Sequence, residues 1–434
     1  MRMGTDSDRP VGADGPVGAD RPVGADGSAG TDGRGARGPV TRQERALAPD
    51  LARGVMLAFI ALANAPLFLY DRPRGPRLHV IDTGLVDRIA SFVVVTFVDG
   101  RAYPMFAALF GYGMVQLYRR QRASGSAEPA IRRVQVRRNL WLLVFGIVHA
   151  ALLFPGDILG GYGLAGLFML ALLPVSDRGL LAWAAVCTVP VVVLGSTYGL
   201  ATGGGGALVG ALSTQDPWEA MSLRLADWLA TTPFTALMVL LPMVLGLWAG
   251  RRRILDEPER HRVLLRRAAV AGLTLALAGG LPLDLVVVGV QPSSSVTVNL
   301  VYGALHTLTG VAGGLGYAAL VGLLAARLQS RWARQALPGQ RREVAPGRIT
   351  TAVAACGERS LSCYLAQSVV FVLLFTPYAG GLGAHLGSAA TAGVALLTWL
   401  AIVAGAGVLG RVGRRGPAEV LLRSLTYRAP RGNR

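Results

Sequence analysis

Residues 145–167 read FGIVHAALLFPGDILGGYGLAGL, and the rest of the chain can be ordered around them. Two apolar segments meet at the turn 155–157, with His149 in the first segment, Asp157 in the turn and Tyr162 in the second segment. Ionisable side chains in a membrane-depth segment are costly unless they face protein or water, so they mark candidate functional sites. The alternative is structural: a neighbouring helix binds His149, and Asp157 caps the following helix.

The composition is typical of a membrane protein. The 434 residues are 52% hydrophobic and 16% charged, whereas a soluble domain carries about a quarter charged residues. Several apolar runs approach the ~20 residues that span a bilayer. All 43 basic residues are Arg, and they cluster between the apolar runs, which favours membrane orientation over nucleic-acid binding. We expect an all-α, polytopic transmembrane bundle that has the lipid bilayer as a partner and does not bind nucleic acid.

We expect about ten transmembrane helices. They are predicted at residues 54–70, 102–118, 140–154, 158–173, 180–200, 234–250, 268–290, 300–326, 360–378 and 388–409. Segment 85–98 is apolar for only about 14 residues, which is short for a span and favours an interfacial or re-entrant helix. If this segment crosses, the number of helices is eleven.

The chain divides into a tail and a membrane domain. Residues 1–49 repeat the unit Pro-Val-Gly-Ala-Asp and then become rich in Gly and Arg. Such a segment cannot bury apolar surface, so we expect a disordered, cytoplasmic tail. Residues 50–434 form the transmembrane domain. The three Cys lack CxxC spacing and the His residues form no i, i+4 pair, so we expect no disulfide framework and no metal site.

Arginine distribution sets the expected orientation. The loops 119–138, 251–267 and 327–359 hold seven Arg each, and the chain ends in a basic tail. The positive-inside rule places these segments in the cytoplasm. Connections with almost no Arg alternate with them and should be external: 155–157, 201–232, 291–299 and 379–387. With ten helices, both termini are cytoplasmic.

This topology brings polar side chains together in the external half of the membrane. Residues expected on external loops or helix ends are His79, Asp82, Asp99, Arg101, Asp157 and His385. His149 and His306 are each about two helical turns from the external end of their helices. A His beside a carboxylate suits general-base chemistry, because the carboxylate fixes the imidazole tautomer. We predict that His149, Asp157 and Tyr162 line one externally accessible cavity with His79 or His306.

A further polar stripe begins the helix predicted at 360–378. Ser360, Tyr364 and Gln367 follow at i, i+4 and i+7 and therefore share a helix face. Polar stripes of this kind often hold membrane helices together. A contact with substrate is the alternative.

The chain resembles the YeiB family of bacterial membrane proteins, which contain domain of unknown function 418. The residues that carry the resemblance are Asp50, Arg53, Gly54, Asn64, Arg101, Phe106, Leu109-Phe110-Gly111, His149, Gly156-Asp157-Ile158-Leu159, Tyr162-Gly163, Gly357, Arg359, Tyr364, Gln367, Trp399, Gly416-Pro417, Glu419, Arg423 and Thr426. The resemblance covers residues from about 50 to the end, with a C-terminal conserved part at about 233–434. It implies a multi-pass protein of the bacterial plasma membrane.

That family is distantly similar to the transmembrane acyltransferases, including heparan-glucosaminide acetyltransferase and the acyltransferase-three family. The latter place a catalytic His after an Arg and ten residues. Here Arg53 and ten residues lead to Asn64. Heparan-glucosaminide acetyltransferase is similar in having Asn at this position and its His in the next external loop. The corresponding loop here holds His79, at a different spacing. Asp99 and Pro104 resemble that enzyme's Asp and Pro at the start of the next helix.

Three functions are therefore open. As an acyltransferase, the protein would move an acyl group from a cytoplasmic thioester to an external glycan, lipid or small-molecule acceptor, with the Arg-rich inner face holding acyl-coenzyme A. His149, Asp157 and His79 are then the candidate catalytic residues. Candidate substrate-binding residues are Arg53, Asn64, Asp99, Arg101, Tyr162, His306, Tyr364 and Gln367. As a transporter or flippase, the protein would use Gly/Pro-interrupted helices and midplane polar groups without covalent chemistry. The third function is a membrane scaffold for a biosynthetic system.

The topology can be tested by cysteine accessibility in intact cells. Ser126 lies in an Arg-rich loop that should be cytoplasmic, so Ser126→Cys should remain unlabelled by an impermeant thiol reagent. Ala379→Cys, in a predicted external connection, should be labelled and serves as the control. Labelling of Ser126→Cys in intact cells would contradict this orientation.

Overall fold

The computed structural model describes residues 47–200, 206–292, 295–335 and 347–427. The chain divides into two units, Met1–Gly35 and Ala36–Arg434, and the helices described below belong to the second. The tail predicted at 1–49 lies outside the described residues except for its last three, which already begin the first helix.

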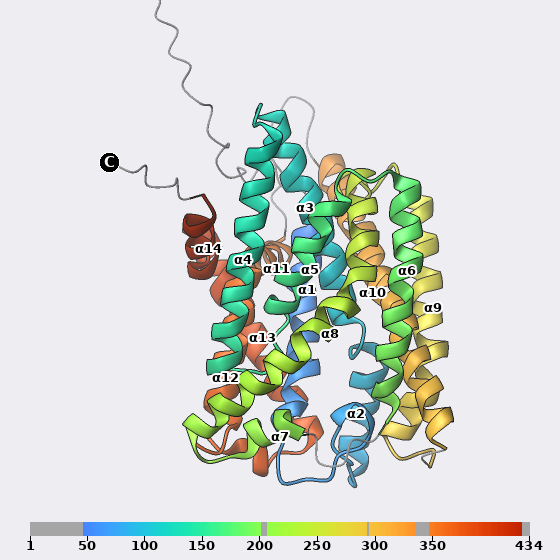
Figure 1. Ribbon diagram of the computed structural model, residues 1–434, viewed down its shortest axis with the longest axis vertical. Coiled ribbons are helices and arrows are strands. Elements are labelled where there is room, and N and C mark those ends of the chain that lie inside the picture. The colour runs from blue at the N-terminus through green and yellow to red at the C-terminus, as the bar shows by residue number, and fades with distance from the viewer. Residues whose placement is uncertain (1–46, 201–205, 293–294, 336–346, 428–434) are drawn as a thin grey trace, which may run out of the picture. The chain divides into compact units, whose positions relative to one another are not determined.

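Helices make up the regular structure of the described residues, apart from one isolated bridge between Arg74 and Val80 (Figure 1). This confirms the all-α prediction. The helices are α1 (Leu47–Asn64), α2 (Leu85–Phe97), α3 (Ala102–Ala123), α4 (Glu128–Leu152), α5 (Leu159–Leu172), α6 (Asp177–Ser196), α7 (Gly206–Ser213), α8 (Pro217–Arg251), α9 (Arg262–Val287), α10 (Val296–Gln335), α11 (Arg348–Glu358), α12 (Ser360–Phe375), α13 (Ser388–Arg411) and α14 (Pro417–Tyr427).

Each predicted apolar segment falls on a helix, but the predicted number of spans is not confirmed. Among the described residues, seven helices are long and apolar enough to cross a membrane, and eight if the bent pair α11–α12 counts as one span. Helix α5 is apolar but has only 14 residues. Helix α8 begins at Pro217, so it absorbs the end of the connection predicted at 201–232; Asp216 caps it by accepting a hydrogen bond from the Trp218 amide.

Helices α2 and α3 form one interrupted candidate span, Leu85–Ala123. The sequence predicted an interfacial segment at 85–98, with Asp99 and Arg101 at an external helix end. The structure differs, because Arg101 donates to the carbonyl of Ala276, near the middle of α9. The interruption follows from Gly100, whose φ of 73° lies in the left-handed region that favours glycine. Charged side chains therefore sit at a helix break inside the bundle.

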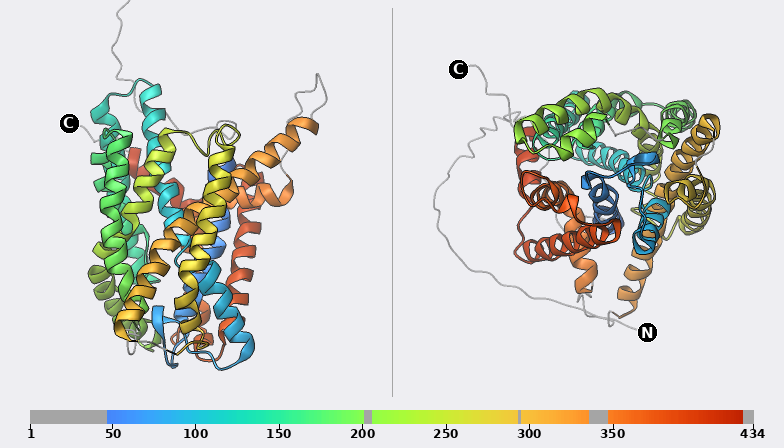
Figure 2. Two further views of the ribbon diagram at one scale, coloured as in Figure 1. Left: turned by 90° about the vertical axis from the view of Figure 1, so that its right-hand side faces the viewer. Right: turned by 90° about the horizontal axis from the view of Figure 1, so that it is seen from below.

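Helix α1 lies in the middle of the bundle, and the view from below shows other helices around it (Figure 2). It contacts α3, α10, α11, α12 and α13. Its closest approach is to α11, where a Cβ on Gly54 would lie 2.1 Å from the Val353 carbonyl oxygen, and one on Gly357 would lie 1.8 Å from that of Asp50. Small residues at such crossings let two membrane helices meet backbone to backbone.

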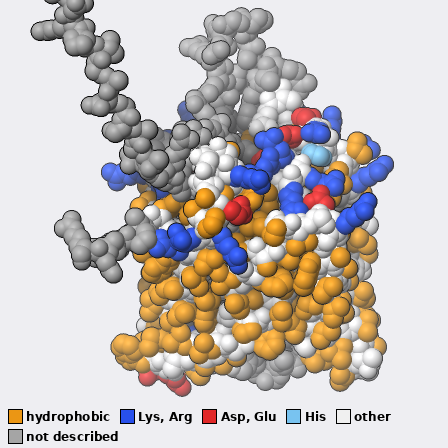
Figure 3. Space-filling view, turned by 45° about the horizontal axis from the view of Figure 1, so that its top comes forward, with side chains coloured by type: hydrophobic (Ala, Val, Ile, Leu, Met, Phe, Trp, Pro, Cys, Tyr) orange, Lys and Arg blue, Asp and Glu red, His pale blue; other side chains and the backbone are white. Residues whose placement is uncertain are grey.

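Charge marks one end of the bundle. Arginine side chains gather over the end that carries the α3–α4 and α8–α9 connections, and hydrophobic side chains cover the surface below them (Figure 3). We call this the arginine-rich end. An apolar belt bordered by Arg is the surface of a multi-pass membrane protein.

The α1–α11 crossing predicts a position-specific effect of added methyl groups. Gly357→Ala should lower the free energy of unfolding by about 1–3 kcal/mol, because its Cβ would overlap the Asp50 carbonyl. Gly405→Ala in α13 is the matched control, since no atom lies within 4 Å of its Cβ. Thermal unfolding in detergent measures both. Equal melting temperatures for the two variants would contradict the close approach.

Candidate functional site

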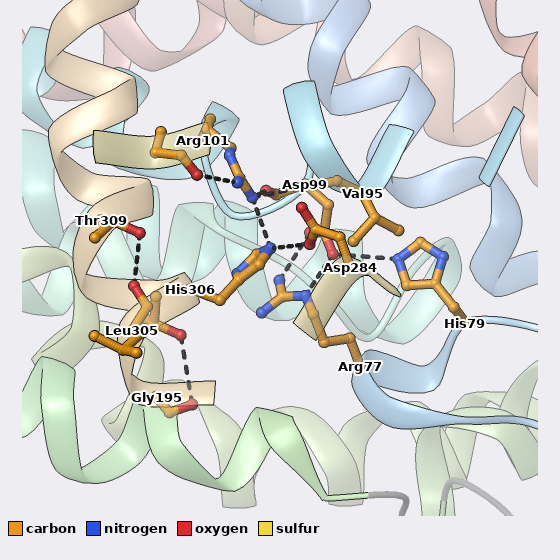
Figure 4. Close-up of polar contacts among 12 residues, drawn as sticks. Arg77, His79, Val95, Asp99, Arg101, Gly195, Asp284, Leu305, His306 and Thr309 are labelled. Carbon is orange, nitrogen blue, oxygen red and sulfur yellow. Dashed lines mark hydrogen bonds and ion pairs between the residues drawn. The ribbon is translucent and has the colours of Figure 1, made fainter. Parts of the chain in front are cut away.

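A histidine, a carboxylate and an arginine meet where the α1–α2 loop touches the α2–α3 break (Figure 4). His79 Nε2 lies 3.2 Å from Asp99 Oδ2. Arg77 binds the same carboxylate with two hydrogen bonds, Nε to Oδ2 at 2.6 Å and Nη2 to Oδ1 at 2.9 Å. With Nε2–H donating to Asp99, the Nδ1 lone pair of His79 remains to accept a proton.

Asp99 and Arg77 determine each other's charge state. Their side chains are 17% and 8% exposed. Burial acts to lower the pKa of the Arg77 guanidinium, but the charge and hydrogen bonds of Asp99 outweigh burial and raise this pKa above its ordinary value. Arg77 therefore stays charged, and Asp99 is held as the carboxylate that fixes the His79 ring.

The loop that carries these residues has a strained backbone. Asp71, Arg77 and Leu78 all adopt positive φ angles, of 58°, 58° and 62°. Such conformations cost about 1–3 kcal/mol each and persist where the surroundings hold them. Arg74 supplies part of this support by donating to the carbonyls of Leu78 at 2.6 Å and Leu67 at 3.0 Å. Strain of this kind clusters at functional sites.

His79 and Asp99 line a cavity of about 280 Å³, which we call the histidine cavity. Its polar wall also includes Asn64, Arg77 and Tyr103. The buried hydroxyl of Tyr103 has no hydrogen-bond partner among the described residues. The polar wall further contains Asp157, Tyr198, Thr231 and Thr235, and apolar lining residues include Ile60, Ala63, Leu67, Leu78, Phe154, Ile158, Leu208, Met238 and Val239.

A second cluster lies beside the break, where Arg101, at the N-cap of α3, meets side chains of α9 and α10 (Figure 4). Arg101 is fully buried, and its guanidinium donates to the carbonyl oxygens of Val95 and Ala276 and lies 2.6 Å from His306 Nε2. His306 Nε2 is also 3.2 Å from Asp284 Oδ1. Arg101 thus donates to the backbone carbonyls of Val95 and Asp99, near the end of α2. A cation at this end of a helix is favourable, because the helix dipole is negative there.

His149 and Asp157 form a third cluster with Ser368. His149 Nδ1 is 2.9 Å from Asp157 Oδ1, and His149 Nε2 is 2.9 Å from Ser368 Oγ. The second carboxylate oxygen of Asp157 accepts from the Gly160 amide at 2.7 Å and from Trp228 Nε1 at 3.3 Å. The cluster joins α4, the turn before α5, α8 and α12. Asp157 thus holds the start of α5 and also binds His149, which are the contacts that the structural alternative expected.

The arginine-rich half of the bundle contains a cavity of about 370 Å³, which we call the arginine cavity. Four arginines and three carboxylates line it: Arg53, Arg120, Arg138, Arg423, Asp50, Glu358 and Glu419. Arg53 pairs with Asp50 at 2.7 Å, and Arg138 lies over the Phe110 ring at 4.8 Å. Tyr162 and Tyr364 form part of the wall. Ile60 and Ile158 line both this cavity and the histidine cavity.

The structure distributes the predicted site residues over these places. His79, Asn64, Asp99 and Asp157 line the histidine cavity. Arg53, Tyr162 and Tyr364 line the arginine cavity.

The other predicted residues line neither cavity. Arg101, His149 and His306 belong to buried clusters. Gln367 donates to the Leu57 carbonyl at 3.0 Å and so holds α12 against α1. The prediction that His149, Asp157 and Tyr162 line one cavity is not confirmed: Asp157 lines the histidine cavity, Tyr162 lines the arginine cavity, and Ile158, which follows Asp157 in the chain, lines both.

Sequence reasoning missed several members of the clusters. Arg77 lies in a predicted external loop, Trp228 lies in the connection predicted at 201–232, and Ser368 is one of many helical hydroxyls. Asp284 is an acid within the apolar segment predicted at 268–290, near its external end, and was expected in the external half without being predicted as a site residue. Arg77 gave no comparable signal, since its role depends on the left-handed turn that brings it to Asp99.

Comparison with known proteins supports a family relationship for the C-terminal part of the chain. Residues 249–429 match the family described as "Protein of unknown function (DUF418)". The chain is 26% identical over 427 residues to "Uncharacterized protein YxaH" of Bacillus subtilis (strain 168), covering 90% of this chain and 96% of that protein. It is 34% identical over 132 residues to "Uncharacterized 39.9 kDa protein in amylase 3'region" of Bacillus acidopullulyticus, covering 30% and 35%. The resemblance inferred from the sequence is confirmed over residues 249–429.

The buried His149–Asp157 pair predicts a large stability effect. His149→Ala should lower the free energy of unfolding by about 3–5 kcal/mol, because it leaves a buried carboxylate without its imidazole partner. His149→Gln should recover part of the loss, since its amide can donate to Asp157. The exposed His385 provides the control variant His385→Ala. If His149→Ala melted at the wild-type temperature, the pair would contribute nothing to the fold.

Proposed function

We propose that this chain, a DUF418 protein over residues 249–429, is an acyltransferase of the bacterial plasma membrane that moves an acyl group from a cytoplasmic thioester donor to an extracytoplasmic acceptor. The observation that carries the proposal is the pair of cavities that share Ile60 and Ile158 as lining residues. One cavity is rich in arginine and the other contains a histidine held by a carboxylate. This arrangement suits a donor and an acceptor that approach from opposite sides of a membrane.

The donor would bind in the arginine cavity. The positive-inside rule places the arginine-rich end in the cytoplasm, where acyl thioesters are made. Guanidinium groups bind phosphate oxygens in bidentate fashion, and the cavity offers Arg53, Arg120, Arg138 and Arg423. Acyl-coenzyme A is larger than about 370 Å³, so the pantetheine arm would enter the cavity while the nucleotide stays at its mouth.

The acceptor would bind in the histidine cavity. His79 Nδ1 would take the proton from an acceptor hydroxyl or amine, while Asp99 holds the ring and stabilises the imidazolium. General-base assistance of this kind contributes about 10²–10⁴-fold to a rate. The unpartnered hydroxyl of Tyr103 could donate to the oxyanion that develops on the acyl carbonyl. Asn64 adds an amide for an external glycan, lipid or small molecule.

A transporter is the second candidate, and the broken span α2–α3 favours it. Interrupted helices with charged groups at the break are common at the substrate sites of secondary transporters. Here the break brings Asp99, Arg101 and His306 together inside the bundle. A transporter of this kind would move its substrate without breaking a thioester.

The test uses purified full-length protein in detergent with radiolabelled acetyl-coenzyme A and an extract of envelope lipids and glycans. The wild type should transfer label or release coenzyme A, and His79→Ala should reduce the rate by about 10²-fold or more, because the base is lost. His385→Ala, which alters an exposed histidine outside the cavity lining, should retain full activity. Intact thioester after incubation with the wild type, together with substrate-driven flux in vesicles, would replace the enzyme by the transporter.

A further inference from the structure

Resting on the proposed acyltransferase function, we propose that Ser368 is a nucleophile that carries the acyl group as an ester between the two cavities. The sequence did not single out Ser368 as a site residue. Its hydroxyl completes a Ser368–His149–Asp157 series in which each neighbouring pair is 2.9 Å apart. This order of nucleophile, base and orienting carboxylate is the arrangement that activates serine in hydrolases and transferases on unrelated folds.

The carboxylate of this series is firmly held. Asp157 Oδ1 faces His149 Nδ1, so the imidazole keeps its proton on that nitrogen and presents the Nε2 lone pair to Ser368. The other oxygen accepts from the Gly160 amide and the Trp228 indole. Three donors thus surround Asp157, and the side chains of His149 and Asp157 have no exposed surface. A base oriented in this way can take a proton without moving.

The hydrogen bonding of Ser368 differs from that of other helical hydroxyls in this protein. A serine or threonine in a helix usually donates to the carbonyl four residues earlier. Thr309, Thr376 and Thr426 do so, at 2.6, 2.7 and 2.7 Å. Ser368 lies 3.4 Å from the Tyr364 carbonyl but 2.9 Å from His149. Ser368 Oγ therefore has two acceptors in reach, and the imidazole nitrogen is the nearer one.

The position of the series in the bundle suits a carrier between donor and acceptor. Tyr364, one turn before Ser368, lines the arginine cavity, and its ring centroid is 4.9 Å from that of His149. Asp157 lines the histidine cavity, and Ile158 lines both. Ser368 itself lines neither cavity, so side chains around it must move for the thioester to reach Oγ. A covalent carrier explains how two substrates in separate cavities can exchange a group.

The two half-reactions balance without another reactant. In the first, Ser368 Oγ attacks the thioester carbonyl carbon while His149 Nε2 takes the hydroxyl proton. The C–S bond breaks, and this proton passes to the leaving thiolate, which gives the serine ester and free coenzyme A. In the second, an acceptor hydroxyl or amine attacks the ester carbonyl carbon and gives its proton to His79 Nδ1 as the new bond forms. The C–O bond to Ser368 breaks, Ser368 Oγ takes a proton that water delivers through His149 Nε2, and His79 returns its proton to water, so no proton is gained or lost overall.

A fluorophosphonate probe tests the nucleophile directly on the full-length protein in detergent. The wild type should form one phosphonyl adduct, located at Ser368 by peptide mass spectrometry. Ser368→Ala should lose the adduct, and His149→Gln should slow its formation by about 10²-fold or more, because the base is removed. Thr376→Ala, at the C-cap of α12, is the matched control; its hydroxyl bonds only locally, so labelling should be unchanged. Melting temperatures identify variants that fail to fold.

Parallel acid-quenched incubations with acyl-coenzyme A separate this proposal from the proposed function. A mass increase of one acyl group on the Ser368 peptide supports the carrier. Thioester turnover by the wild type with no phosphonyl or acyl adduct at Ser368 overturns the carrier and leaves the acyltransferase in place. A phosphonyl adduct at Ser368 without thioester turnover supports the reactive serine and overturns the thioester donor.

Discussion

A bilayer supplies no hydrogen bonds, and this constraint explains where the polar side chains of this protein lie. A charged group inside the hydrocarbon region must find its partners within the protein. Asp99 meets this requirement most fully. Its carboxylate binds Arg77 and His79, and its backbone carbonyl accepts from Arg101. Charged side chains therefore stabilise the break between α2 and α3: Arg77 binds the Asp99 carboxylate, and Arg101 binds the Asp99 backbone carbonyl. Arg77, His79 and Asp99 also form part of the polar wall of the histidine cavity.

The sequence contains enough information to predict most of the fold. Apolar runs identify the helices because each must bury its backbone polar groups within itself. Periodicity could not show that α2 and α3 belong to one interrupted span, since Gly100 reads as an ordinary loop glycine until its positive φ is known. Helix ends were also misplaced, as at α8, where Pro217 and the Asp216 cap begin the helix well before its apolar part.

The candidate site was predictable only in pieces. His149 and Asp157 are eight residues apart on either side of one turn, so their contact follows from the sequence. Their third partner does not, because Ser368 is 219 residues from His149 and only the fold brings these two side chains together. The sequence did not predict that Asp157 and Tyr162 line different cavities for a similar reason. The cavity that each side chain lines depends on how helices distant in the sequence, such as α1, α3 and α12, pack around the turn before α5.

The proposed function depends on the two cavities that share Ile60 and Ile158 as lining residues. The most direct measurement is a structure of the full-length protein with a non-hydrolysable acyl-coenzyme A analogue. The account predicts phosphate density beside Arg138 and the acyl end in the arginine cavity against Ile158, with the histidine cavity still open. Analogue density outside the arginine cavity, or no binding at concentrations that saturate known acyl-coenzyme A enzymes, would contradict it.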